Sequence, residues 1–145
     1  MKEIVKYSRC FVCGDQNEHG LRARFFEDGD QVITDLVTEP SFEGYRGIYH
    51  GGIISTLLDE VMIKAILARD ILAVTGEITV RFRQPIGIGV RLRLAGRIVR
   101  VKKRVYVTEG EAVGEDGTVF ATAKGSYIEA PPELRSTLAE SLEPQ

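Results

Sequence analysis

The chain has 145 residues, a formal net charge of -2 and 43% hydrophobic residues. This length fits one compact domain, so a single domain is expected over residues 1–145. The near-neutral charge argues against a protein that coats nucleic acid. No apolar run is long enough for a membrane span or a secretory signal, and a cytoplasmic location is the default expectation.

An irregular lead-in is predicted over residues 1–20, where glycines mark turns. Within it, Cys10 and Cys13 form a Cys-x-x-Cys pair. A zinc site needs about four ligands, and the histidines of the chain are His19 and His50 alone. We expect the two thiols to be structural, because free cysteines are usually buried; metal binding and redox chemistry are the alternatives.

Two strands are predicted after the lead-in, over residues 21–26 and 31–38. The Asp28-Gly29 pair between them is a strong hairpin signal. A loop with proline and glycines follows, and it leads to a segment with a different period.

From Gly51 to Arg69, apolar side chains recur at helical spacing over a broad stripe, which predicts a long and largely buried helix. Glu60 precedes Lys64 by four residues, the spacing of a surface ion pair, so both are predicted to face solvent. Asp59 instead interrupts an apolar run, where a carboxylate costs free energy unless it is paired or used. The paired alternative is a hydrogen bond to Ser55 or to a neighbouring strand.

Alternating apolar residues after the helix predict four more strands, one around residues 78–82 and three over 90–101, 104–113 and 118–128. Residues 131–145 are expected to be peripheral and to contain a short helix. One helix that is apolar over so much of its surface needs cover on more than one side. The expected fold is therefore α+β, a curved antiparallel sheet of about six strands wrapped around one long central helix.

His50, Gly51 and Gly52 stand where the buried helix begins. The first N–H groups of a helix lack internal partners and lie at the positive end of its dipole, so they can hold a carbonyl oxygen as it becomes an oxyanion. A flexible joint between loop and helix is the alternative interpretation. The chain has no Gly-x-Ser-x-Gly elbow, no phosphate-binding loop and no dinucleotide fingerprint.

These residues carry a resemblance to a known family. His50-Gly51-Gly52 with Asp59, followed by Arg81-Phe82-Arg83-Gln84-Pro85, resembles the PaaI-like hotdog thioesterases of phenylacetate metabolism. The lead-in Cys10-Phe11-Val12-Cys13-Gly14 is similar to a signature in the branch that includes thioesterase superfamily member four. The resemblance covers roughly residues 10 to 128.

The resemblance implies a hotdog fold and a homodimer or homotetramer with its active site at the dimer interface. It assigns Asp59 as general base or nucleophile and the Gly51 amide as the group that polarises the thioester carbonyl. Thr75 matches a hydroxyl residue that positions water. No metal or organic cofactor is implied for the reaction.

Three further positions follow from the resemblance. His50 is expected to order the loop before the helix and not to act as a base. Gly52 is expected to help bind the substrate. Gly44 stands where many relatives have Asn or Gln, so the contribution of this loop to binding differs here.

Positive charge gathers in the third quarter of the chain. Solvated strand faces explain many of these residues, and the alternative is that they bind the phosphates of coenzyme A. Nucleic acid is a weaker interpretation, because no aromatic stacking platform accompanies the charge. The candidate phosphate ligands are Arg81, Arg83, Arg100, Lys102, Lys103 and Arg104.

The sequence therefore predicts an acyl-CoA thioesterase, with the acyl group left open. One alternative is a hotdog hydratase or dehydratase, which normally pairs a catalytic histidine with an acid; His50 is the one candidate for that role. The other alternative is an acyl-CoA-binding protein without catalytic activity.

Overall fold

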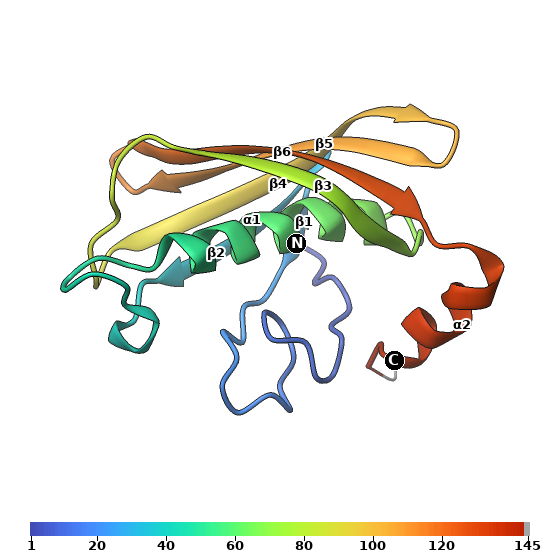
Figure 1. Cartoon of the computed structure of the whole chain (residues 1–145), viewed down its shortest axis with the longest axis horizontal. Helices are drawn as coiled ribbons and strands as arrows, with labels where there is room; N and C mark the ends of the chain where they lie inside the picture. The colour runs from blue at the N-terminus through green and yellow to red at the C-terminus, as the bar shows by residue number, and fades with distance from the viewer. Residues whose placement is uncertain (144–145) are drawn as a thin grey trace.

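The computed structural model describes residues 1–143, and its core is one antiparallel sheet beside one long helix (Figure 1). The strands lie in the order β1-β2-β4-β5-β6-β3. The strands are β1 (Phe26–Asp28), β2 (Gln31–Val37), β3 (Ala73–Phe82), β4 (Arg91–Lys102), β5 (Val105–Gly114) and β6 (Val119–Glu129). The helices are α1 (Gly51–Leu67), α2 (Pro132–Glu140) and the short 3-10 turn η1 (Pro40–Phe42).

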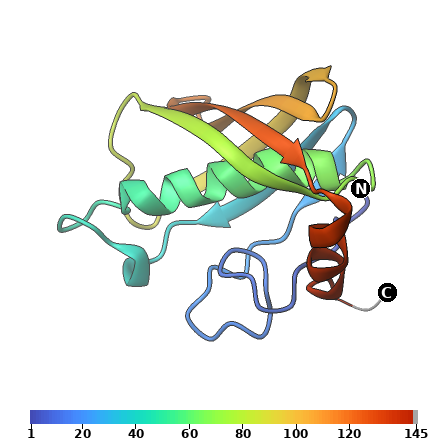
Figure 2. The same cartoon turned by 45° about the vertical axis from the view of Figure 1, so that its right-hand side comes forward.

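Helix α1 runs along the concave side of the sheet (Figures 1 and 2). Its Leu57, Leu58, Val61 and Met62 are fully buried. They meet apolar residues of the sheet such as Leu94, so one core forms between helix and sheet. The predicted α+β fold, with six strands curved around a central helix, is confirmed. Among residues 1–143, no helix is long and apolar enough to cross a membrane.

The helix and the centre of the sheet touch through their backbones. A Cβ atom at Gly96 in β4 would lie 2.6 Å from the carbonyl oxygen of Val61 in α1. A real Cβ atom cannot approach an oxygen so closely, so glycine is required here. This close approach lets the curved sheet wrap around α1.

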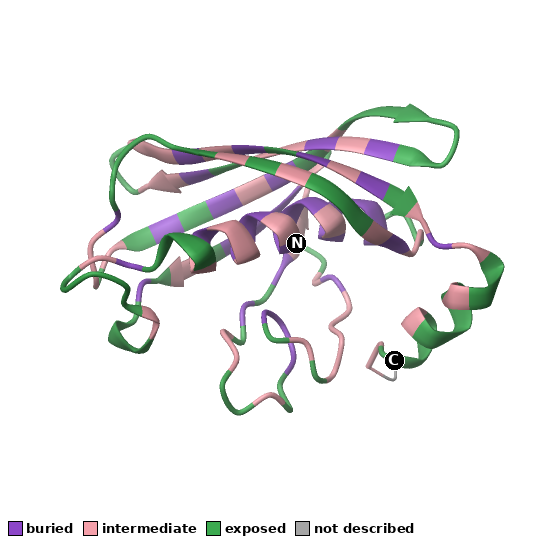
Figure 3. Ribbon diagram, in the orientation of Figure 1, coloured by how far each residue is buried: buried purple, intermediate pink, exposed green. Residues whose placement is uncertain are grey.

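The lead-in covers the side of α1 that faces away from the sheet (Figure 1). Its Val12 and Cys13 are buried against the core, and this cover also buries Glu60 and Lys64 of α1. Figure 3 shows buried segments, in purple, both along α1 and in the lead-in. The side chain of Lys64 is 0% exposed and that of Glu60 is 12% exposed. The prediction of a solvent-facing ion pair is therefore wrong. A spacing of four residues places two charges on one helix face, but it does not say what covers that face.

The element boundaries differ from the predicted ones where the lead-in is involved. Residues 21–25 are not part of the first strand; instead, the N–H groups of Leu21 and Ala23 donate to lead-in carbonyls at 2.8 Å. β1 is only Phe26–Asp28, although the predicted hairpin turn follows it. Helix α2 occupies most of the predicted peripheral segment 131–145, of which residues 144–145 lie outside the described part.

Candidate functional site

One side of α1 is covered neither by the sheet nor by the lead-in. Gly52, Ser55, Asp59 and Ile63 recur there at helical spacing, and all are at least partly exposed. Strand β3 runs alongside and, within residues 1–143, pairs with β6 alone, so it is an edge of the sheet. The free strand edge and this stripe of α1 border the same open region.

The carboxylate of Asp59 is held by two hydroxyl groups. Its Oδ1 accepts hydrogen bonds from Thr75 Oγ1 at 3.0 Å and from the Tyr127 hydroxyl at 2.9 Å. No donor among residues 1–143 contacts Oδ2. Asp59 is thus oriented by neutral donors and keeps one oxygen for a water molecule or a substrate.

A β-bulge brings Thr75 to this position. Thr75 lies opposite Tyr127 and Glu77 lies opposite Ser126, so Gly76 is an extra residue in β3. In a regular strand, Thr75 would share a face with Thr79, away from the helix. The bulge turns Thr75 onto the face that contacts α1, where it reaches Asp59.

Tyr127 is the site residue that the sequence analysis missed. It is 0% exposed, and burial, then the neighbouring charge of Asp59, raises its pKa well above the usual range. Tyr127 therefore stays protonated and serves as a hydrogen-bond donor. The signal in the sequence is weak: Tyr127 is the one bulky residue after Ala121, Ala123 and Gly125 on this face of β6. A Cβ atom at Gly125 would lie 2.6 Å from the Tyr127 ring, so this glycine makes room for it.

His50 caps the N-terminus of α1. Its Nδ1 accepts a hydrogen bond from the Gly52 N–H at 2.8 Å, so this nitrogen is unprotonated. The Gly52 amide is already used in this bond and is not a free donor for a substrate. Gly44 packs on the His50 ring, since a Cβ at Gly44 would lie 3.2 Å from it. His50 therefore connects the loop at Gly44 to the first turn of α1.

The Gly51 amide is the donor left at the helix start. Gly51 is exposed, and within residues 1–143 its N–H donates no hydrogen bond. The ring of Phe82 lies 3.6 Å from the position of a Cβ at Gly51. Gly51 and Asp59 are eight residues apart on one helix, which corresponds to roughly 12 Å along its axis.

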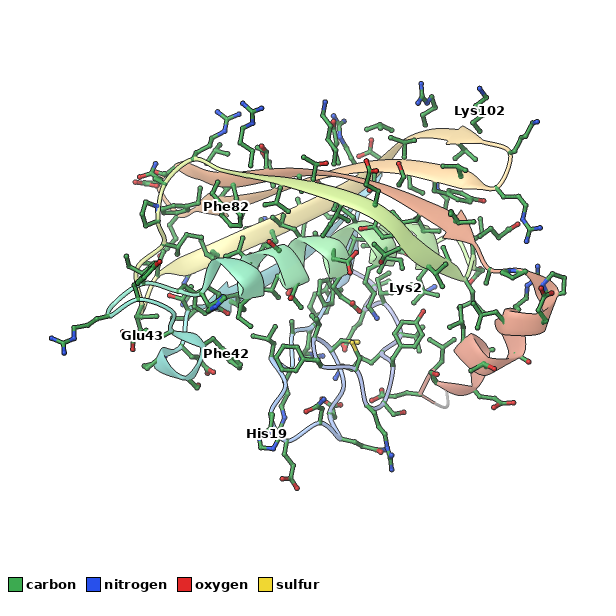
Figure 4. The ribbon with its side chains drawn as sticks, in the orientation of Figure 1. Lys2, His19, Phe42, Glu43, Phe82 and Lys102 are labelled. Carbon is green, nitrogen blue, oxygen red and sulfur yellow. The ribbon has the colours of Figure 1, made fainter. Side chains whose placement is uncertain are left out.

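The basic residues predicted to bind phosphates do not form one cluster within the chain. Arg81 and Arg83 flank Phe82, at the end of β3 near Gly51. Lys102 lies at the opposite end of the sheet from Phe82 (Figure 4). Arg100, Lys102, Lys103 and Arg104 form a second group around the β4–β5 turn. Next to this turn, Val105 pairs with Ile128 of β6, whereas Phe82 pairs with Ala121 of the same strand. The two groups are therefore about seven residues, or roughly 23 Å, apart along the strands.

The two cysteines form a second polar cluster on the other side of α1. The Sγ atoms of Cys10 and Cys13 both lie 3.7 Å from Glu60 Oε1. Burial raises the pKa of Glu60 to about 7. A hydrogen bond from the Cys13 thiol lowers the pKa of Cys10, and the same bond raises the pKa of Cys13. The cysteines are buried or half-buried, as expected for structural thiols, but they contact a carboxylate that the sequence placed in solvent.

A sequence model of the family described as "Thioesterase superfamily" matches residues 46–121, which include Gly51, Asp59 and Thr75. No curated protein sequence matches the chain.

Solved structures share the fold. The crystal structure of a thioesterase superfamily protein has a TM-score of 0.79 at 24% identity, and covers 84% of this chain and 61% of that one. This chain thus spans less than two thirds of that relative. The PaaI protein from the phenylacetic acid degradation operon of E. coli has a TM-score of 0.69 at 18% identity. That match covers 74% of this chain and 78% of the PaaI chain. A Streptococcus mutans protein bound to acetyl CoA has a TM-score of 0.69 at 20% identity, and the match covers 73% of this chain and 86% of that one.

Proposed function

Because the chain belongs to the thioesterase superfamily and has the hotdog fold of PaaI-like proteins, we propose that it hydrolyses an acyl-CoA thioester to the free acid and CoA. The observation that carries the proposal is the carboxylate of Asp59. It is held by two hydroxyl donors on an open side of α1, the helix that begins with the unpaired amide of Gly51. Structures of similar proteins with acetyl CoA or coenzyme A bound support this substrate class.

The site needs two copies of the chain. A thioester carbonyl that accepts a hydrogen bond from Gly51 lies about 3 Å from that amide, and its carbon must be attacked by Asp59 or by a water beside it. Within one chain these groups are roughly 12 Å apart along the helix, which is too far. We therefore place Gly51 of one protomer next to Asp59 of its partner.

The free edge of β3 supports this arrangement. It is ten residues long and exposes Thr75 and Phe82, of which Phe82 is 51% exposed. A long unpaired edge with an exposed aromatic residue favours pairing with a second copy. Two β3 strands that pair across a two-fold axis bring the two open regions beside each other. A homodimer, alone or doubled into a tetramer, completes two such sites.

The proposed reaction has two stages. Asp59 takes the proton of a water that Thr75 helps to position, and this water attacks the thioester carbon; in the direct variant, the carboxylate itself attacks and water then cleaves the anhydride. The Gly51 N–H, aided by the positive end of the α1 dipole, stabilises the oxyanion. The C–S bond then breaks, and CoA leaves as a thiolate that takes up the proton.

The basic residues are assigned to the CoA phosphates. Arg81 and Arg83 lie at the Gly51 end of β3, so they are placed to meet a CoA whose thioester reaches Gly51. The group from Arg100 to Arg104 lies at the other end of the sheet, and a contact with the same CoA requires the second protomer.

Release of free CoA, followed with a thiol reagent, tests the proposed function. The panel contains short, medium, long and aryl acyl-CoAs, and Asp59→Asn is assayed in parallel. We expect turnover that falls by about 10²–10⁴-fold in Asp59→Asn, the usual size of a general-base contribution. Asp116→Asn, in the exposed β5–β6 turn, is the matched control and should keep full activity. Turnover by Asp59→Asn at the wild-type rate would refute the assignment.

The same preparation separates the two alternatives. A hydratase or dehydratase would add or remove water on an enoyl or 3-hydroxyacyl thioester without release of thiol. A binding protein would hold acyl-CoA without turnover. The Nδ1 atom of His50 is engaged with the Gly52 amide, which favours hydrolysis over a mechanism based on a histidine.

A further inference from the structure

We propose that Cys10, Cys13 and Glu60 form a binding site for a single Zn²⁺-like divalent metal ion, which joins the lead-in to α1. The site is separate from the proposed catalytic groups and takes no part in thioester hydrolysis. Glu60 is 47 to 50 residues away from the two cysteines in the sequence, and only the folded chain brings the three donors together.

The distances fit a tetrahedral ion. The Cys10 Sγ, Cys13 Sγ and Glu60 Oε atoms all lie within 4.8 Å of one another, and both sulfur-to-oxygen distances are 3.7 Å. Zinc bonds of about 2.3 Å to sulfur and 2.0–2.2 Å to oxygen, at tetrahedral angles, place sulfur and oxygen roughly 3.6 Å apart. An ion can therefore be held without a large movement of the backbone.

The backbone of the Cys-x-x-Cys turn places one N–H group against each of the two sulfur atoms. The Val12 N–H lies 3.3 Å from Cys10 Sγ, and the Tyr7 N–H lies 3.4 Å from Cys13 Sγ. Such N–H donors orient sulfur ligands from the outer shell and stabilise their negative charge. Gly14 completes the turn, because a Cβ there would lie 2.5 Å from the backbone nitrogen of Cys10.

The charges balance for a divalent ion. Two thiolates and the Glu60 carboxylate carry three negative charges in a covered region. The Lys64 ammonium is fully buried, lies 4.0 Å from Glu60 Oε1 and is fixed by the Val5 carbonyl at 2.6 Å. One positive charge on lysine leaves two negative charges, which an ion of charge +2 neutralises.

The fourth position of the ion is open to water. His19 lies at the outer tip of the lead-in, away from α1 (Figure 4), and is exposed. Cys10 is partly exposed, so solvent reaches this side of the cluster. A dithiol that forms a reversible disulfide is the competing interpretation of the same pair.

Titration with Co²⁺ tests the proposal on the full chain after chelation and reduction. We expect one Co²⁺ per chain, with the thiolate charge-transfer band and the strong visible bands of a tetrahedral ion, and displacement by Zn²⁺. Cys10→Ser and Cys13→Ser should each lose most of the charge-transfer band. Glu60→Gln should keep the band but bind at least about tenfold more weakly.

Asp59→Asn is the matched control, because its carboxylate is one residue away on the other side of α1, and it should bind Co²⁺ like the wild type. Zn²⁺ should also raise the thermal midpoint of the wild type and not that of the serine variants. No charge-transfer band in the reduced wild type would overturn the proposal. Equal affinity of Glu60→Gln and wild type would also overturn it. The wild-type titration does not depend on whether any variant folds.

Discussion

Asp59 and Glu60 are consecutive residues of α1, yet their carboxylates lie in different environments. Asp59 accepts hydrogen bonds from the hydroxyls of Thr75 and Tyr127. Glu60 points toward the lead-in, where it contacts the two cysteines. Neighbouring residues of a helix project about 100° apart, so one helix presents acids to two separate regions.

We predict that the hydroxyl group of Thr75 contributes to kcat and that its methyl group does not. Thr75→Val removes the donor 3.0 Å from Asp59 with little change of shape, and kcat should fall about tenfold to a hundredfold. Thr75→Ser keeps the hydroxyl and should retain most of the activity. Steady-state kinetics of both variants check this, and equal rates for Val and wild type would remove Thr75 from the site.

Tyr127→Phe should weaken both the site and the fold. The variant loses a buried hydrogen bond to a carboxylate, which contributes about 1.5–3 kcal/mol, so urea unfolding should report a lower stability. The rate should also fall, because Asp59 keeps only its bond to Thr75. A variant as stable and as active as the wild type would show that this hydrogen bond has no role.

The alkaline side of the pH–rate profile gives a separate test of Tyr127. Burial raises its pKa above the ordinary value of 10.0, so the donor stays protonated while pH rises through 10. The rate should therefore show no loss that reports Tyr127 ionisation in that range. Tyr127→Phe is the control, and its profile should have the same alkaline shape as that of the wild type. A loss of wild-type rate near pH 10 that the variant lacks would show that Tyr127 ionises in this range, and would contradict the prediction.

Gly51→Pro should remove the oxyanion donor and keep the helix. Proline is favoured at the first helical position, and His50 before it has the extended backbone that a following proline requires. Loss of one such donor costs about 10²–10³-fold in kcat. Gly51→Ala keeps the N–H, and its Cβ meets the Phe82 ring at an ordinary 3.6 Å, so it is the matched control.

Mixing two inactive variants tests whether the site spans two protomers. In a mixed dimer of Gly51→Pro and Asp59→Asn, the shared arrangement leaves one site with both wild-type groups. Random exchange of subunits should then restore roughly a quarter of the wild-type activity. If Gly51 and Asp59 of the same protomer acted together, every site would lack one group and mixing would restore nothing.

Gly96→Ala tests the contact between α1 and the sheet. Its Cβ would lie 2.6 Å from the Val61 carbonyl oxygen, so the helix must shift, at a cost of about 1–3 kcal/mol in unfolding free energy. Gly87→Ala is the control, because a Cβ there meets the Val90 side chain at 3.6 Å and the Gly47 carbonyl oxygen at 3.9 Å, both ordinary contact distances. Equal urea midpoints for Gly96→Ala and wild type would mean that the helix does not pack as closely as described.

Much of the fold could be predicted from the sequence. The length and burial of α1 and the strands after it depend on local periodicity and on residues that are close along the chain. Asp59 could be singled out for the same reason, since a carboxylate within an apolar helical stripe is visible in the sequence alone. Thr75 entered through the resemblance to a family, and nothing in its local pattern indicated a role.

Only the tertiary structure decided which groups surround the two acids. The bulge at Gly76 turns Thr75 toward the helix, and Tyr127 reaches Asp59 from 68 residues away. The lead-in turns an apparent surface pair, Glu60 and Lys64, into a buried cluster with the cysteines. Periodicity tells which residues share a face of an element, whereas the segment that covers this face depends on contacts between residues far apart in the chain.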